Sequence, residues 1–307
     1  MSQYKFLITS SPHIHSGESV QKIMFSVAGA LLLPTLAGVY FFGTRALILV
    51  ITATLAAVAT EAIFQKLRGK PVTVWDGSAI VTGMLLALNV TPALPVWMVV
   101  VGSVVAIGLG KMIYGGLGMN PFNPALIGRV FLTVTFPVQM TTWINPVDGT
   151  TGATPLALMK MQGVPTDYYK LFIGNVGGCL GETSALAVLV GGLYLIYKGY
   201  VDWRIPVSYI GTVAVLTFIL GKDPIFHILA GGLLLGAFFM ATDMVTTPVT
   251  KLGRIIFGIG AGIFVVLIRL YGGYPEGVSF SILLMNAFTP IINRLTVPRI
   301  YGEVKTR

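Results

Sequence analysis

Long apolar stretches with almost no charge follow one another through this chain, and they constrain its fold more than any other feature. A helix needs about 20 mostly apolar residues to cross the hydrocarbon core of a bilayer. Only 10% of the residues are charged, whereas soluble domains average about 25%. The sequence therefore predicts an all-α integral membrane protein in the lipid bilayer. We expect about ten transmembrane helices, centred on 23–43, 46–64, 78–91, 96–114, 123–140, 183–198, 205–221, 226–242, 252–272 and 280–295.

The basic residues predict which side of the membrane each loop faces. If the spans alternate, 14 of the 20 Lys and Arg residues fall on the side of the N-terminus. Cytoplasmic loops carry the excess of Lys and Arg, so we predict that both termini are cytoplasmic and that loop 141–182 is extracytoplasmic. This bias also accounts for the net charge of +9, and we expect no nucleic-acid partner. The six basic residues outside the cytoplasmic set are Arg45, Arg129, Lys160, Lys170, Lys222 and Arg269.

An internal echo indicates that the ten helices form two units. The segment TGMLLALNVTP at 82–92 resembles GAFFMATDMVTTP at 236–248, and the two segments lie in the third and eighth predicted spans. A repeat of five spans inverts the second unit relative to the first, as in many transporters. We therefore predict a single membrane domain, 1–307, with repeats at 1–140 and 183–307. The alternative is that a polar residue before Thr-Pro is simply how a membrane helix ends.

The extracytoplasmic loop contains the polar stretch DGTTGATPLA, residues 148–157. Gly149 and Gly152 make its backbone permissive, and Pro155 favours an extended conformation for Thr154. We therefore expect the Thr154 hydroxyl to be accessible, although composition alone is more typical of an ordinary turn. With no histidine near it in sequence, this hydroxyl is a poor nucleophile, and we assign no catalytic residue in the loop.

The same stretch resembles a flavin-attachment motif. That motif runs Asp, two or three variable residues, then Ser/Thr-Gly-Ala-Thr, and it occurs in the family of the Rnf complex D subunit and the sodium-pumping NADH:quinone reductase B subunit. The matching residues are Asp148, Thr151, Gly152, Ala153 and Thr154. The resemblance extends over nearly the whole chain, and the length of 307 residues suits the D subunit better. It includes SSPHIHSGES, WDGSAIVTGMLLALNVTP, GGLGMNPFNPALIGRVF and FMATDMVTTPVT.

The resemblance implies that Thr154 carries FMN through a phosphoester bond, which a separate flavin transferase installs from FAD. It also implies a second flavin, non-covalent riboflavin, at the cytoplasmic side near 115–124. The chain would then be an electron-transfer subunit of a translocase in a bacterial or archaeal cell membrane. The whole complex would move electrons between ferredoxin and NAD, coupled to transport of Na⁺ or H⁺.

Other Rnf subunits are the partners that this resemblance implies, and they should hold the sites for ferredoxin and NAD. The single cysteine, Cys179, excludes an iron–sulfur cluster held by this chain alone, because such clusters need several cysteine ligands. We predict no metal site, since His13 and His15 have no third ligand near them in sequence.

Polar residues within membrane spans are costly and are functional candidates by default. Arg129 could hold a flavin or pair internally. Asp243 could cap a helix, contact a flavin or take part in ion transport. Asn120, like Asn89, Asn123 and Asn286, could contact a ring edge or satisfy a broken helix end.

Three further segments have simpler interpretations. We expect Glu61 to pair with Lys66 or Arg68 near the cytoplasmic end of the second span. The segment GGLGMNPFNP at 115–124 lacks the spacing of a phosphate-binding loop and is more typical of a tight turn. The segment YGGYPEGVSF at 271–280 is interpreted as an outer turn.

Two other functions compete with electron transfer. An inverted five-helix plan also resembles urea-channel architecture, so a small-solute transporter is one alternative, because fold does not fix function. A structural anchor for redox subunits is the other. Neither alternative explains the Thr-Gly-Ala-Thr loop, and the presence of a flavin on Thr154 would separate electron transfer from both alternatives.

Overall fold

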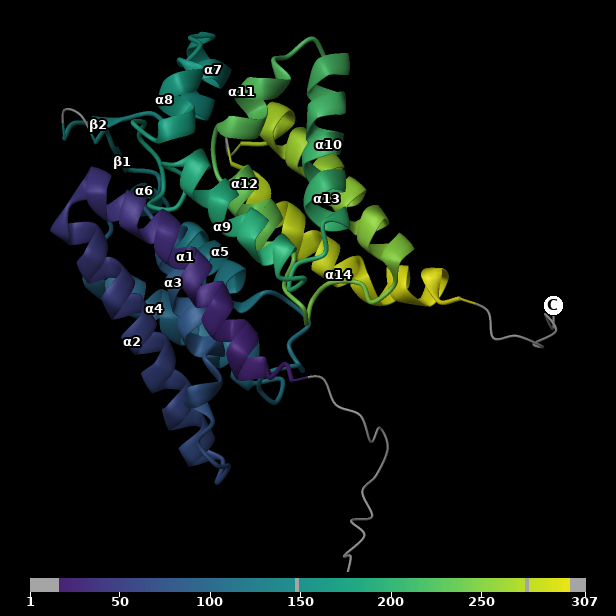
Figure 1. The fold of residues 1–307 in the computed structure, drawn as a ribbon. Coiled ribbons are helices and arrows are strands. Elements are labelled where there is room, and N and C mark those ends of the chain that lie inside the picture. The colour runs from purple at the N-terminus through teal and green to yellow at the C-terminus, as the bar shows by residue number, and fades with distance from the viewer. Residues whose placement is uncertain (1–16, 147–148, 274–275, 299–307) are drawn as a thin grey trace, which may run out of the picture.

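A computed structural model describes residues 17–146, 149–273 and 276–298, and most of them are helical (Figure 1). Within these described residues, four helices are long and apolar enough to cross a membrane: α1 (Val20–Phe42), α2 (Thr44–Leu67), α13 (Lys251–Tyr271) and α14 (Val278–Thr296). The shorter apolar helices are α3 (Ser78–Leu88), α4 (Val96–Ile107), α5 (Pro124–Thr135), α9 (Ala185–Tyr197) and α10 (Arg204–Ile219). The predicted helical membrane class is therefore confirmed, while the count of ten spans and the side of the termini stay predictions.

Short elements connect these helices. They are η1 (Val74–Asp76), η2 (Gly108–Met112), α6 (Pro137–Met140), β1 (Trp143–Ile144), β2 (Thr151–Gly152), α7 (Pro155–Gln162), α8 (Tyr168–Ile173), α11 (Pro224–Leu229), α12 (Leu233–Leu235) and η3 (Gly236–Met240). The segment η2 continues α4, and both η2 and η3 are π-helical.

Two predicted spans are not continuous helices. The span at 123–140 is divided at Phe136 into α5 and α6, because Pro137 has no N–H to continue the helix. The span at 226–242 is divided between α11 and α12, where Gly231 has a φ of 73°, a conformation that side chains other than glycine rarely adopt. Both interruptions lie beside pockets described below.

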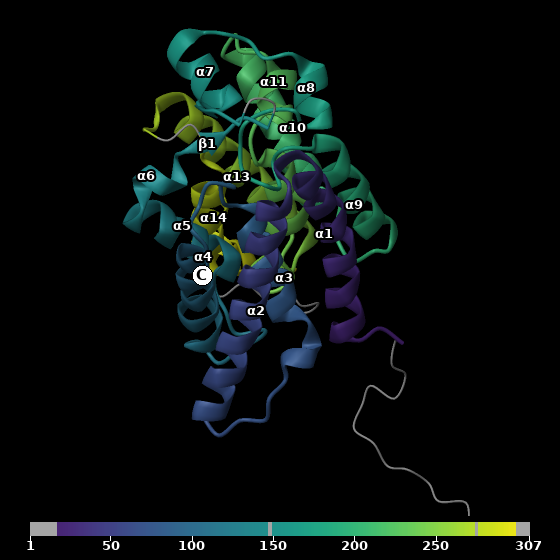
Figure 2. The same cartoon turned by 90° about the vertical axis from the view of Figure 1, so that its left-hand side faces the viewer.

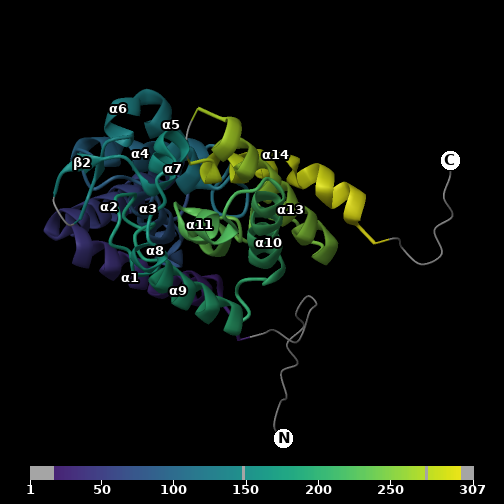
Figure 3. The same ribbon diagram turned by 90° about the horizontal axis from the view of Figure 1, so that it is seen from above.

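The helices form two groups joined at the centre of the molecule. In the first, α2 packs against α3 and α4, and α4 packs against α5; in the second, α10 packs against α13, and α13 packs against α14. Figure 3 shows the two groups side by side, with the purple and blue helices opposite the yellow ones. The helices α7, α8 and α11 cover one end of the molecule (Figure 2).

The two segments of the internal echo meet where the groups join. Asn89 is the C-terminal cap of α3, and its amide donates to the Met240 sulfur at the end of η3, 3.6 Å away. The chain after α8 pairs with the end of α3, because Leu180 N–H donates to Val90 and Gly181 N–H donates to Leu88. Broken helix ends with interior polar groups therefore occupy the core of this membrane protein.

Close helix packing predicts a strong effect for one glycine substitution. A Cβ atom at Gly83 of α3 would lie 2.6 Å from the Thr54 Cα atom of α2. Gly83→Ala should therefore lower the free energy of unfolding by about 1–3 kcal/mol, the usual cost of overpacking. The measurement is thermal unfolding in detergent, with Gly29→Ala in α1 as the control, since nothing lies within 4 Å of the added atom there. Equal stability of the two variants would contradict the close approach.

Candidate functional site

A short hairpin holds the Thr-Gly-Ala-Thr motif. The strands β1 and β2 pair antiparallel, with Trp143 opposite Gly152 and Ile144 opposite Thr151. The base of the hairpin is attached to the membrane helices, because the Thr91 hydroxyl donates to the Thr142 carbonyl oxygen over 2.6 Å. Residues 151–153 are exposed. The predicted motif residue Asp148 lies outside the described residues.

Thr154 is extended but not accessible. Its backbone has φ −65° and ψ 157°, as predicted from Pro155. Its side chain, however, is only 3% exposed, so the expectation of an accessible hydroxyl is wrong for this conformation. The hydroxyl is the N-cap of α7 and accepts the Ala157 N–H over 3.2 Å. Capping draws the side chain inward because it satisfies an N–H group that has no partner within the helix.

A pocket with an empty volume of about 1000 Å³ lies beside the hairpin. Gly152 and Ala153 of the motif line it together with Arg129 of α5. The structure thus brings together sequence candidates that are 23 to 24 positions apart in the chain. The remaining lining residues are Val130, Thr133, Met140, Thr141, Trp143, Ala157, Glu276, Ser279 and Phe280. We call this space the hairpin pocket.

Arg129 is buried at the inner wall of the hairpin pocket. One guanidinium nitrogen donates to Asn89 Oδ1 over 2.7 Å. The other pairs with the Glu276 carboxylate and lies 3.6 Å from Glu182 Oε1. The internal pairing that the sequence left open is therefore present, and the same guanidinium also lines the pocket.

Sequence reasoning missed the two carboxylates and the thiol beside Arg129. The ligand atoms of Cys179, Glu182 and Glu276 lie within 4.8 Å of one another. The segment interpreted as an outer turn therefore also supplies a largely buried charge, because the Glu276 side chain is only 9% exposed. The sequence held one signal for this pairing. Glu276 stands beside a predicted membrane helix, where a carboxylate is costly unless a cation such as Arg129 faces it.

Unpaired polar atoms also line the hairpin pocket. Oε1 of Glu276 and Oγ of Ser279 are buried and have no hydrogen-bond partner within the described part of the chain. Buried polar atoms in native proteins are rarely left unpaired. The pocket therefore offers a cation, an acceptor and a hydroxyl to a polar ligand, beside the aromatic ring of Trp143.

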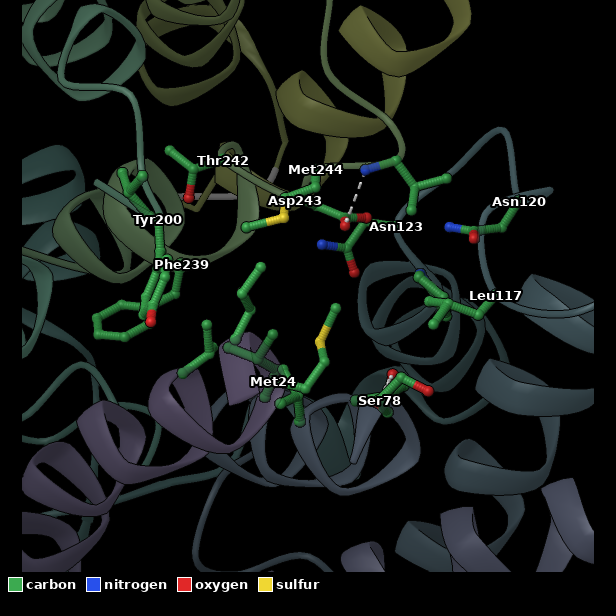
Figure 4. A pocket seen from close by; sticks show the side chains of 18 of the residues that line it. Met24, Ser78, Leu117, Asn120, Asn123, Tyr200, Phe239, Thr242, Asp243 and Met244 are labelled. Atoms are coloured by element: carbon green, nitrogen blue, oxygen red, sulfur yellow. Dashed lines mark hydrogen bonds between the residues drawn. The ribbon is translucent and has the colours of Figure 1, made fainter. Parts of the chain in front are cut away.

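A second pocket, with an empty volume of about 720 Å³, lies between the two helix groups. Asn120 and Asp243, both sequence candidates, line it together with Asn123. Figure 4 shows Asn123 beside Asp243, Asn120 at one side, and Tyr200 and Phe239 at the other. We call this space the central pocket. The sequence candidates therefore divide between two pockets.

The polar residues of the central pocket also satisfy helix ends. Asn123 Oδ1 caps α5 by accepting from Ala125 and Leu126, and its amide donates to the Met240 carbonyl over 3.2 Å. Asp243 accepts from the Val245 N–H and the Thr246 hydroxyl. Residues 115–124 form the predicted turn, with positive φ at Gly115, Gly116 and Gly118.

Glu61 has a different partner from the one expected. Lys111 of η2 donates to both Glu61 oxygens, over 2.8 and 2.7 Å, and to the Ser78 hydroxyl over 2.6 Å. Both charged side chains are almost completely buried, at 2% and 0% exposure. The prediction of Lys66 or Arg68 was wrong: both residues are exposed, and Arg68 instead donates to the Met112 carbonyl. His13 and His15 lie outside the described residues.

Comparison with known proteins places this architecture in a family. The model of the NQR2, RnfD, RnfE family matches residues 7–302, nearly the whole chain. The chain belongs to that family. The predicted resemblance is confirmed, and the hairpin pocket and the central pocket are thus features of an NQR2, RnfD, RnfE family member.

Individual members of the family are similar in sequence to this chain over nearly their full length. The chain is 51% identical to the D subunit of the Na⁺-translocating ferredoxin:NAD⁺ oxidoreductase complex of Acetobacterium woodii, covering 100% of this chain and 98% of the relative. It is also 51% identical to the D subunit of the proton-translocating ferredoxin:NAD⁺ oxidoreductase complex of Clostridium ljungdahlii, covering 97% and 96%. Identity to the D subunit of the ion-translocating oxidoreductase complex of an Escherichia coli strain is 38%, covering 98% and 99%. Relatives of equal identity are thus named for different ions.

Proposed function

We propose that this chain is the D subunit of an ion-translocating ferredoxin:NAD⁺ oxidoreductase complex and carries FMN covalently on Thr154. The observation that carries the proposal is the hairpin pocket, which Gly152 and Ala153 of the motif line together with the buried cation Arg129. The full-length similarity to relatives named as the D subunits of such complexes supports the assignment of the complex. Its other subunits are the partners, and a flavin transferase is the maturation enzyme.

The residues of the hairpin pocket fit a flavin. A phosphate on the Thr154 oxygen would stand at the N-terminus of α7, where the helix dipole favours negative charge. The unpaired atoms of Glu276 and Ser279 can hydrogen-bond a heteroaromatic ring edge. When bound, FMN supplies one- and two-electron redox chemistry. Arg129 and its partner Glu276 supply charged hydrogen-bonding groups at the inner wall, and Trp143 supplies an aromatic surface that excludes water.

The proposed orientation follows from the ends of the helices. Lys22, Lys66, Lys111, Lys198 and Lys251 lie at or near the helix ends of α1, α2, η2, α9 and α13. If these ends are cytoplasmic, the hairpin and α7 lie outside, as the excess of basic residues in cytoplasmic loops favours. The matched packing of α2–α4–α5 and α10–α13–α14 supports two inverted five-helix repeats. We therefore propose that the chain crosses the membrane ten times.

Mass spectrometry of the peptides within 141–170 tests the covalent flavin. The full chain is expressed with a flavin transferase, and an FMN-sized adduct is expected on Thr154. Finding this peptide unmodified, while a known flavoprotein substrate in the same cells is modified, would overturn the proposal. In that case a structural anchor or a small-solute transporter becomes the better assignment, and solute flux into vesicles containing the purified chain separates these two.

The central pocket supports a second, non-covalent flavin, which we propose to be riboflavin. Its amide and carboxylate groups, Asn120, Asn123 and Asp243, lie beside the apolar walls formed by Met24 and Phe239. This combination of an apolar wall with a few polar groups is typical of cofactor sites.

Filling the central pocket tests the riboflavin proposal. Val81 lines the pocket, so Val81→Trp should abolish riboflavin release from the denatured protein, measured by chromatography, and leave covalent FMN unchanged. The control is Val104→Trp, because Val104 is 42% exposed on the outer surface of α4. Equal riboflavin content in both variants would exclude the central pocket as its site.

A further inference from the structure

Three of the six basic residues outside the cytoplasmic set converge on one pocket. Lys160 of α7, Lys222 between α10 and α11, and Arg269 of α13 line a space with an empty volume of about 830 Å³. They come from three segments of the chain that are 47 or more positions apart. In the orientation proposed above, this end is extracytoplasmic, where lysine and arginine are disfavoured. Their convergence there therefore indicates a ligand that needs them. We call this space the basic pocket.

The other residues of the basic pocket are neutral. They are Leu156, Met159, Leu220, His227, Leu270 and Tyr271. The carboxylate closest in sequence, Asp223, does not line the pocket. Its oxygens accept from the backbone N–H groups of Ile225 and Phe226 and from the Tyr168 hydroxyl. The positive charge of the basic pocket is therefore not balanced by a carboxylate among its lining residues.

Arg269 retains hydrogen-bonding capacity in the basic pocket. It is 3% exposed, and its two terminal nitrogens donate to the carbonyl oxygens of His227 and Ala230. Its Nε atom is buried with no partner in the described part of the chain, and so is Nδ1 of His227. A guanidinium presents five N–H donors, and leaving one buried and unpaired is costly. An acceptor from outside the chain would satisfy it.

The lysines leave further donors for the same acceptor. The Lys160 ammonium donates to the Gly272 carbonyl oxygen, which uses one of its three N–H groups. The Lys222 ammonium makes no ion pair with any described residue. Two ammonium groups and a guanidinium around one space match the charge and the several acceptor oxygens of a phosphate group.

Exposed apolar side chains beside the basic pocket indicate where the phosphate comes from. The pocket lies where α10 ends and α11 begins, and the last turn of α10 exposes Phe218 and Ile219, at 74% and 70%. Tyr271, at the end of α13, is 75% exposed and lines the pocket. Tyrosine at the end of a membrane helix is typical of the headgroup level. A phosphate at this depth would bring acyl chains that cover the apolar side chains.

We propose that the basic pocket binds the phosphate of an anionic phospholipid headgroup, held by Lys160, Lys222 and Arg269. This site is separate from both proposed flavin pockets and does not depend on either flavin. The bound lipid would connect α7 to the ends of α10 and α13, since one pocket-lining cation comes from α7, one from α13 and one from the turn that follows α10. The lipid would thereby stabilise α7, the helix that Thr154 caps.

Native mass spectrometry of the full chain in neutral detergent tests the proposal. The probes are dioleoyl phosphatidylglycerol, dioleoyl phosphatidylcholine and inorganic phosphate. Lys160→Gln/Lys222→Gln should bind phosphatidylglycerol about tenfold or more weakly than the wild type, because each basic residue near a lipid surface contributes to such binding. Phosphatidylcholine should bind more weakly than phosphatidylglycerol to the wild type, since its choline opposes the basic residues.

Lys170→Gln is the matched control. Lys170 lies on α8 at the same end of the molecule, is exposed and does not line the basic pocket, so this variant should bind like the wild type. Both substituted lysines are exposed, and an unchanged circular dichroism spectrum verifies folding. Equal phosphatidylglycerol binding by the double variant and the wild type would overturn the site. Displacement of the lipid by equimolar inorganic phosphate would overturn the lipid as its source.

Discussion

Thr154→Asn is expected to abolish covalent flavin while leaving the fold intact. Asparagine is as good an N-cap as threonine or better, so α7 should keep its first turn, but no hydroxyl remains to form a phosphoester. Thr154→Ala should also lose the flavin, and it should in addition lose about 1 kcal/mol of stability with the cap. The measurement is in-gel flavin fluorescence of the denatured chain, made with a co-expressed flavin transferase.

Thr150→Ala provides the matched control for the acceptor. Thr150 lies in the same loop, is exposed, and occupies a variable position of the motif, so the fluorescence should persist in this variant. Persistence in Thr154→Asn would show that another residue accepts the flavin. Loss in both variants would show that the loop as a whole is needed for modification. Because the Thr154 hydroxyl is buried in the folded chain, we expect modification before α7 packs.

Lys111→Met is expected to be the most destabilising single substitution considered. It removes both Lys111 hydrogen bonds to Glu61 and leaves that carboxylate without a cation at 0% exposure, with only the Gln65 amide still donating to it. Removing one partner of a buried ion pair costs roughly 3–5 kcal/mol of the free energy of unfolding. The midpoint of thermal unfolding in detergent should fall accordingly. Lys66→Met, an exposed lysine on α2, should leave the midpoint nearly unchanged.

A double substitution separates the ion pair from simple packing. Glu61→Leu/Lys111→Met removes both charges, and replacing a buried pair by apolar side chains is often neutral or stabilising. The double variant should therefore be more stable than Lys111→Met. If both variants are equally unstable, the aliphatic part of Lys111, rather than its charge, holds η2 against α2 and α3.

Much of the fold, and the motif, could be predicted from the local sequence. Uncharged apolar stretches such as those in α1 and α2 determine membrane helices, because burial in lipid follows from composition within one segment. Pro155 determined the extended backbone of Thr154, and Pro137 ended α5, because a proline restricts its own φ and its neighbour's conformation. The motif, together with similar segments along nearly the whole chain, was likewise enough to identify the family.

The tertiary structure decided which polar groups meet. Glu276 and Arg129 are 147 positions apart, and Lys111 and Glu61 are 50 apart. Neither pairing has a signature in either segment alone. The burial of Thr154 and the convergence of Lys160, Lys222 and Arg269 likewise have no signature in the local sequence. The physical reason is that a buried charge selects its partner among the groups that packing brings within a few ångströms, whereas sequence patterns describe only neighbours along one helix or turn.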